Sequence, residues 1–170
     1  MADLRGYGFM RGWIYEAIAI TGGGRHQAPM GVSTPDYRRV VLEVYRTAET
    51  CENLMDDGML VIVFPRNVLD FERALSGRRP SMLKDFLKLR VASRKRLKEK
   101  VRFECEVKES HLREGLRLIN RAESLVLESL IEATKPRPRR QLIAENLRLV
   151  KRVAKDSEYQ RLLERLLNRR

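Results

Sequence analysis

The chain is constrained most by residues 13–34, where a glycine run separates two segments of strand length. Positions 14–21 are β-branched and apolar over most of their length, which predicts a strand. Gly22, Gly23 and Gly24 tolerate the positive φ of a tight turn, so we expect a hairpin whose return strand includes 27–32. That return strand contains Pro29, which has no N–H to donate to a sheet. Pro29 therefore marks an edge strand, a bulge, or backbone that is free to face a flat ligand.

Strand signals continue through the first 110 residues. Residues 38–45 and 101–107 alternate between apolar and polar side chains, and 59–64 are continuously apolar, as is typical of a central buried strand. Between these strands we expect short helices, one beginning at a Thr47 cap, the others over 68–75 and 81–89.

After His111 the apolar spacing becomes helical. The pattern predicts helices over 116–134 and 141–155, and a last one capped by Ser157 and ending near 167. Alternating βαβ units are absent, so antiparallel strands with segregated helices are expected, an α+β barrel. We expect a barrel domain over 1–110 and a helical subdomain over 111–170.

Composition limits the location and the chemistry. Cys51 and Cys105 are too few for a disulfide framework, so we expect two buried thiols in a reducing cytoplasm. No apolar run approaches the roughly 20 residues that span a bilayer, and the first residues do not form a signal peptide. His26 and His111 lie in no metal-binding spacing, so no metal site is expected. Gly22–Gly24 lacks the pattern of a phosphate-binding loop.

One combination of residues does favour binding of an anion. Arg46, Thr47 and Thr50 lie where a strand is expected to end and a helix to begin. A guanidinium, two hydroxyls and the free N–H groups of a helix start would then come together. The alternative is an ordinary helix cap with a surface arginine.

Several segments together resemble a known family. G-W-I-Y-E-A-I-A-I-T, G-G-G-R-H-Q-A-P-M-G-V and V-Y-R-T-A-E-T-C-E-N-L resemble an archaeal family of flavin-binding split-barrel proteins, domain-of-unknown-function family 447. Residues 120–134, N-R-A-E-S-L-V-L-E-S-L-I-E-A-T, are similar to the helical region of the same family. The resemblance implies an antiparallel split β-barrel of the FMN-binding type, with a C-terminal helical extension.

The resemblance also implies a site. FMN would lie at the interface of a homodimer, with its ring beside 27–32 and its phosphate near Thr47 and Thr50. The cofactor-binding residues implied are His26, Gln27, Ala28, Pro29, Met30, Arg46, Thr47, Thr50 and Asn53. If the protein is a flavin reductase, a nicotinamide would donate the hydride. The family usually carries an asparagine where this chain has Val61, so fewer polar groups near the flavin are expected.

Two other functions stay open. Residues 89–170 hold 23 Lys and Arg against 12 Asp and Glu, whereas residues 1–88 hold 12 against 11, so the net charge of +12 lies almost wholly in the second half. Basic clusters at 94–100 and 135–140 suggest nucleic-acid binding, although few aromatic residues accompany them. The third hypothesis is a dimeric structural protein that has lost its flavin.

Overall fold

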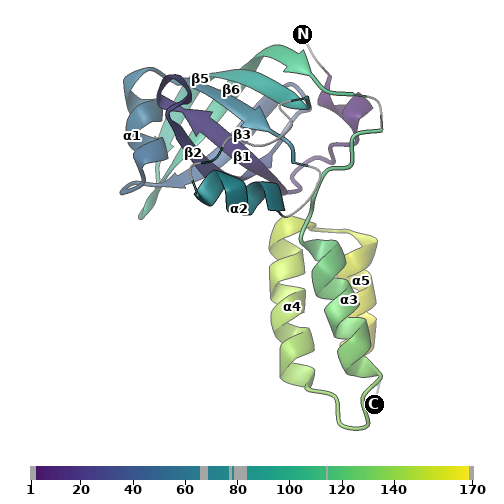
Figure 1. Ribbon diagram of the computed structural model, residues 1–170. Helices are drawn as coiled ribbons and strands as arrows, with labels where there is room; N and C mark the ends of the chain where they lie inside the picture. Colours follow the sequence, from purple (N-terminus) through teal and green to yellow (C-terminus); the bar gives the residue numbers. More distant parts are fainter. Residues whose placement is uncertain (1–2, 66–68, 77, 79–83, 114, 169–170) are drawn as a thin grey trace. The chain divides into compact units, whose positions relative to one another are not determined.

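The computed structural model describes residues 3–65, 69–76, 78, 84–113 and 115–168 (Figure 1). The chain forms two compact units, and each is described by itself. The barrel unit comprises residues 1–11 and 15–119, and the helical unit comprises residues 12–14 and 120–170.

The barrel unit is a closed antiparallel barrel, which confirms the predicted α+β barrel (Figure 1). In the described part, its strands are β1 (Tyr15–Thr21), β2 (His26–Ser33), β3 (Arg39–Tyr45), β4 (Met59–Val63), β5 (Phe86–Arg96) and β6 (Lys100–His111). They follow one another around the barrel in the order β1-β2-β3-β6-β5-β4. The remaining elements are η1 (Leu4–Tyr7), η2 (Gly22–Gly24), α1 (Glu49–Asp56) and α2 (Leu69–Leu75).

The barrel core follows the alternation of its strands. Val40, Leu42 and Val44, which share one face of β3, are buried, and Val41 between them is buried as well. Phe103 and Cys105 of β6 are fully buried on the inward face. Because successive side chains of a strand point to opposite faces, the polar residues between them are directed outward.

β2 is paired with β1 along nearly its whole length, but with β3 only near its end. Residues Tyr15 to Thr21 of β1 pair with Val32 to His26 of β2. The β2–β3 ladder, in contrast, contains only Val32 with Leu42 and Ser33 with Val41. Pro29 pairs with Ile18 of β1, in the part of β2 that lies beyond this short ladder. The N–H that Pro29 lacks therefore costs no β2–β3 hydrogen bond.

The helix predicted over 81–89 is wrong where the structure describes it, since Phe86–Arg96 is β5. Leu87 pairs with Ile62 of β4, and Leu89 pairs with Leu60. Both leucines are fully buried by this pairing, which gives them the two-residue period of a strand. Residues 81–83 of the prediction, and residue 68 of the helix predicted over 68–75, lie outside the described residues.

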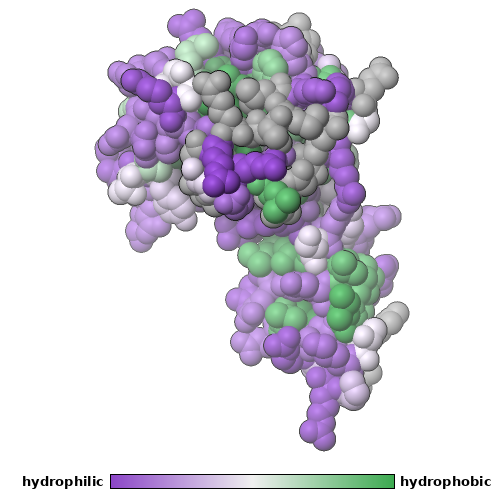
Figure 2. Space-filling view, viewed as in Figure 1, coloured by the Kyte–Doolittle hydropathy of each residue, from purple (hydrophilic) through white to green (hydrophobic). Residues whose placement is uncertain are grey.

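The helical unit packs α3 (Ala122–Ala133), α4 (Arg140–Val153) and α5 (Glu158–Asn168) around a separate core. Val126, Ile143, Val150 and Leu163 are the buried centre of that core. The predicted last helix and its cap are confirmed, since Ser157 Oγ accepts a hydrogen bond from the N–H of Gln160 at 3.2 Å. Figure 2 shows apolar side chains on the surface of this unit, where Leu127 and Ile131 are 59% and 55% exposed. No helix in the described part is long and apolar enough to cross a membrane.

α3 begins later than the predicted helix over 116–134. The carbonyl of Ile119 accepts a hydrogen bond from the N–H of Glu16 in β1, which keeps the chain extended there. Asn120 follows, and its Oδ1 accepts a hydrogen bond from the N–H of Ala122 at 2.7 Å. Its Nδ2 donates to the carbonyls of Ile14 and Val153 at 2.9 and 2.8 Å. One amide side chain therefore binds the first N–H of α3 and ties residues 12–14 to the end of α4.

Replacing Asn120 with Ala is expected to destabilise the helical unit. The variant leaves a helix N–H and two carbonyls without this partner, at a cost of about 1–3 kcal/mol. Chemical denaturation followed by far-ultraviolet circular dichroism measures the loss. The control is Gln141→Ala, at an exposed position. Equal stability of the two variants would show that the hydrogen bonds of Asn120 do not stabilise the helical unit.

Glu132 is a buried carboxylate in the last turn of α3, with its side chain 3% exposed. Arg139 donates to it from its backbone N–H at 2.9 Å and its guanidinium at 3.2 Å, and Lys135 donates at 2.6 Å. These hydrogen bonds, those of Arg139 first and Lys135 next, lower the pKa of Glu132 from 4.5 to about 2. The depressed pKa means that ionised Glu132 stabilises the folded unit.

We expect Glu132→Gln to be less stable than wild type at neutral pH and the difference to narrow on acidification. The stabilisation is fully present above the unfolded pKa of 4.5, and it is lost as the pH falls toward the folded pKa of about 2. Thermal unfolding at a series of pH values measures this difference. The exposed Glu128→Gln is the control, and a pH-independent difference between Glu132→Gln and wild type would contradict the linkage.

Candidate functional site

α1 begins just after β3, and its first turn has no side-chain cap. The N-cap residue is Ala48, and the prediction that Thr47 caps this helix is wrong. The N–H of Ala48 bonds instead to the carbonyl of Tyr45 at 3.0 Å, which places Thr47 in the tight turn before the helix, where it is exposed. Because alanine cannot accept a hydrogen bond through its side chain, N–H groups at the helix start are left for another acceptor.

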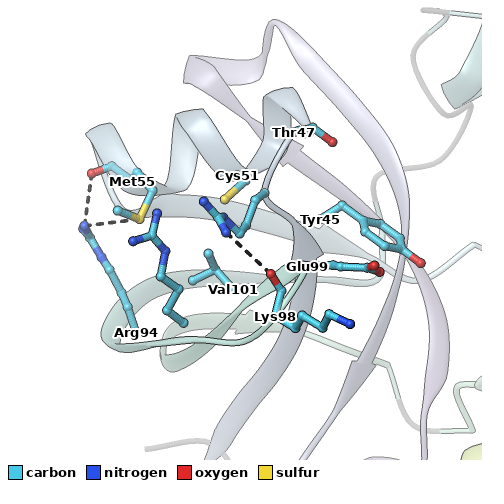
Figure 3. Close-up of a pocket in the computed structure, with 10 residues that line it drawn as sticks. Tyr45, Thr47, Cys51, Met55, Arg94, Lys98, Glu99 and Val101 are labelled. Carbon is cyan, nitrogen blue, oxygen red and sulfur yellow. Dashed lines mark hydrogen bonds between the residues drawn. The ribbon is translucent and has the colours of Figure 1, made fainter.

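A cavity of about 910 Å³ lies between α1 and the tip of the β5–β6 hairpin (Figure 3). It is lined by Tyr45, Arg46, Thr47, Cys51, Met55, Arg94, Arg96, Lys98, Glu99 and Val101. Among these described residues, four cationic side chains face one carboxylate. The cavity is therefore suited to a ligand that carries negative charge and some apolar surface.

Pairing between strands explains why the cations gather there. Arg94 lies opposite Phe103 and Arg96 opposite Val101 in the β5–β6 ladder, so both arginines share the inward face of the barrel wall. Arg94 Nη1 donates to the carbonyl of Met55 at 3.2 Å, at the end of α1. Arg46 is tied to the hairpin through its backbone N–H, which donates to the carbonyl of Glu99 at 3.0 Å.

A second cluster joins another face of α1 to the β1–β2 turn. Nε2 of His26 is 2.9 Å from the hydroxyl oxygen of Thr50, and Nδ1 of His26 is 3.2 Å from a carboxylate oxygen of Glu49. Asn53 Nδ2 donates to the hydroxyl of Thr21 at 3.1 Å. Thr50 is 1% exposed, so its hydroxyl is engaged inside the protein.

The structure thus divides the residues predicted to bind the cofactor. Arg46 and Thr47 line the cavity, whereas His26, Thr50 and Asn53 form the second cluster. Ala28, Pro29 and Met30 are partly buried along β2. Gln27 also lies on β2, and its buried Oε1 has no hydrogen-bond partner among the described residues. Val61, where the family's asparagine was expected, packs against an apolar cluster that includes Ile18 and Val63.

The basic residues of the hairpin were evident from the sequence, but the sequence did not predict that they share a cavity with Arg46. The basic cluster at 94–100 suggested nucleic-acid binding only as an alternative function. The alternation of Arg94 and Arg96 was the available signal, but it required β5 to be recognised as a strand. Only the register with Phe103 and Val101 assigns both arginines to the inward face.

Nucleophilic and metal chemistry find little support in the described residues. No group of three or more His, Cys, Asp or Glu in that part could hold a metal ion. Cys51 lines the cavity but is 4% exposed, and burial raises the pKa of its thiol. Burial also raises the pKa of Cys105 to about 12. Both side chains therefore remain neutral thiols at neutral pH, poor nucleophiles, as expected for buried cysteines.

Solved structures similar to this chain cover either the complete chain or about two thirds of it. A crystal structure of an FMN-bound protein from Methanosarcina mazei, assigned to family model DUF447, matches at 20% identity, 97% coverage of this chain, 98% coverage of that chain and a TM-score of 0.55. A flavoredoxin from Methanosarcina acetivorans has 13% identity, with 59% of this chain and 69% of that chain covered and a TM-score of 0.47. A flavin reductase domain protein from Arthrobacter sp. FB24 has 12% identity, with 66% and 85% covered and a TM-score of 0.49.

No curated protein matches the sequence. The likeness to the Methanosarcina mazei protein shows a shared fold along nearly the whole of both chains. The family model described as "Protein of unknown function (DUF447) N-terminal domain" matches residues 15–117, which is more than half of the chain. The chain therefore belongs to the DUF447 family.

Proposed function

We propose that this protein binds FMN and that Arg46 and Thr47 hold its phosphate. The observation that carries the proposal is the cation-lined cavity beside the uncapped start of α1. A phosphate carries about −1.5 to −2 charges and three acceptor oxygens at neutral pH, and it is stabilised by guanidinium groups and by helix N–H groups. The related protein from Methanosarcina mazei was crystallised with FMN, which supports the same cofactor here.

The other residues present also fit a flavin. Tyr45, Met55 and Val101 give the cavity apolar surface for the uncharged parts of the cofactor. The buried Oε1 of Gln27 is an acceptor without a donor, and the flavin ring carries one N–H group. Gln27 would thus orient the ring, while the backbone beside Pro29 would bind its polar edge. When bound, FMN supplies the capacity for hydride and electron transfer.

The proposal extends to a redox protein of the flavin-reductase type, with a nicotinamide as hydride donor. Flavin-reductase-like proteins share the split-barrel architecture in general, and this supports the reaction class without naming a substrate. A homodimer with the flavin at its interface, in the cytoplasm of an archaeon, is part of the same proposal. His26 would be held by Glu49 and Thr50 and would present a fixed imidazole near the ring.

We expect purified protein incubated with FMN and desalted to keep the flavin absorbance bands at about one FMN per subunit. The double variant Arg46→Gln/Thr47→Ala is expected to weaken FMN binding by about 1–3 kcal/mol for each charge-assisted hydrogen bond that is lost. Fluorescence titration of FMN measures the affinity. Arg38→Gln, which removes an exposed positive charge at the other end of β3, is the control.

Thr50→Ala distinguishes the two faces of α1. The hydroxyl of Thr50 already contacts His26, so this variant should change FMN affinity less than Arg46→Gln/Thr47→Ala. A larger effect of Thr50→Ala would place the phosphate on the His26 side of the helix. A wild-type protein that keeps no FMN would refute the proposed function.

A further inference from the structure

The β5–β6 hairpin carries more positive charge into the cavity than one FMN phosphate requires. Arg94, Arg96 and Lys98 enter it from the hairpin, and Arg46 enters it from the end of β3. Glu99 is the carboxylate among the described lining residues. If the phosphate is bound at Arg46 and Thr47, the hairpin cations still face the remainder of a cavity of about 910 Å³.

These cations differ in how far other protein groups already satisfy them. Arg94 donates to the carbonyl of Met55 at the end of α1, so part of its hydrogen-bonding capacity is used. The side chains of Arg96 and Lys98, in contrast, have no hydrogen-bond or ion-pair partner among the described residues. Both cations line the same cavity without a protein partner in the described part of the chain, and a bound anion would offset their charge.

The opposite face of the same hairpin has a mixed charge. Lys95 lies opposite Arg102, and Arg102 Nη1 is 3.9 Å from a carboxylate oxygen of Glu43. Glu104 on this side accepts from Arg39 at 2.8 Å. Acidic and basic groups thus alternate on the outer face, whereas cations predominate in the cavity. This distribution favours a compact ligand inside the cavity over a nucleic acid laid across the hairpin.

We propose that Arg96 and Lys98 form a second phosphate subsite, which binds the diphosphate of a small second ligand beside the FMN phosphate. This inference rests on the proposed function. A diphosphate presents two adjacent anionic centres, so a guanidinium and an ammonium from neighbouring positions of one hairpin can bind it together. Such a group is found in dinucleotide hydride donors and in free nucleoside diphosphates.

Isothermal titration calorimetry with inorganic pyrophosphate tests the subsite directly, using the full-length protein with and without FMN at low salt. We expect Arg96→Gln/Lys98→Gln to weaken pyrophosphate binding about tenfold or more, because two charge-assisted contacts are lost. The control Lys95→Gln/Lys108→Gln removes the same charge from β5 and β6 outside the cavity, and it should keep the affinity within about twofold, since exposed charges are screened. FMN affinity of Arg96→Gln/Lys98→Gln, followed by fluorescence, should change far less than that of Arg46→Gln/Thr47→Ala.

Competition distinguishes the two sources of the diphosphate. Displacement of pyrophosphate by NADH or NADPH, but not by ADP, assigns the subsite to a dinucleotide, and equal displacement by ADP assigns it to a nucleoside diphosphate. Unchanged pyrophosphate binding in Arg96→Gln/Lys98→Gln would overturn the subsite. So would loss of FMN in this variant as severe as in Arg46→Gln/Thr47→Ala, since the hairpin cations would then belong to the FMN site.

Two further outcomes would overturn either the subsite or the proposed function. An oligonucleotide that binds with a steep salt dependence, and that pyrophosphate does not displace, would replace the subsite with a nucleic-acid surface. A wild-type protein that takes up no FMN but binds pyrophosphate through Arg96 and Lys98 would overturn the proposed function alone.

Discussion

The architecture depends on the short pairing between β2 and β3. A barrel strand with two full ladders has all its backbone groups satisfied, but β2 meets β3 through Val32 and Ser33 alone. α1 follows directly from β3 at this end of the barrel, and its side chains bond to the β1–β2 turn through Thr50 and Asn53. One incomplete ladder thus gives the fold a place for Pro29 and leaves most of the β2 backbone without partners in β3.

The distribution of charge is better understood in three dimensions than along the chain. Several basic residues of the second half are committed to carboxylates, as Arg113 is to Asp85 and Arg139 to Glu132. Others alternate with acids on the outer surface of β6. The cations that remain concentrated are those of the cavity, where strand pairing brings Arg94 and Arg96 to one face. A net charge of +12 therefore does not describe a uniformly basic surface.

Most of the fold could be predicted because, in most segments, the period of the apolar residues and the length of the segment indicated the same element. β1, β3 and β6 have clear apolar patterns, and the α5 cap at Ser157 is a local signal. The segment 86–89 was assigned to a helix, because its true period depends on Ile62 and Leu60 of a distant strand. The site was partly accessible: Arg46 and Thr47 could be singled out from sequence, but their proximity to Arg96 and Lys98 is created by tertiary pairing. The hydrogen bond between Thr50 and His26 joins residues 24 positions apart. No local pattern in the sequence predicts it.

Residues 12–14 belong to the helical unit although β1 of the barrel follows them immediately. The N–H of Ile14 donates to the carbonyl of Val153, and the ring centroid of Trp13 lies 6.0 Å from that of Tyr159. These contacts close a loop of well over a hundred residues. During synthesis, an early part of the chain must wait for one of the last parts to emerge before the helical unit is complete. The helical unit therefore takes residues from both sides of the barrel segment 15–119, and it can be completed only after that whole segment has been synthesised.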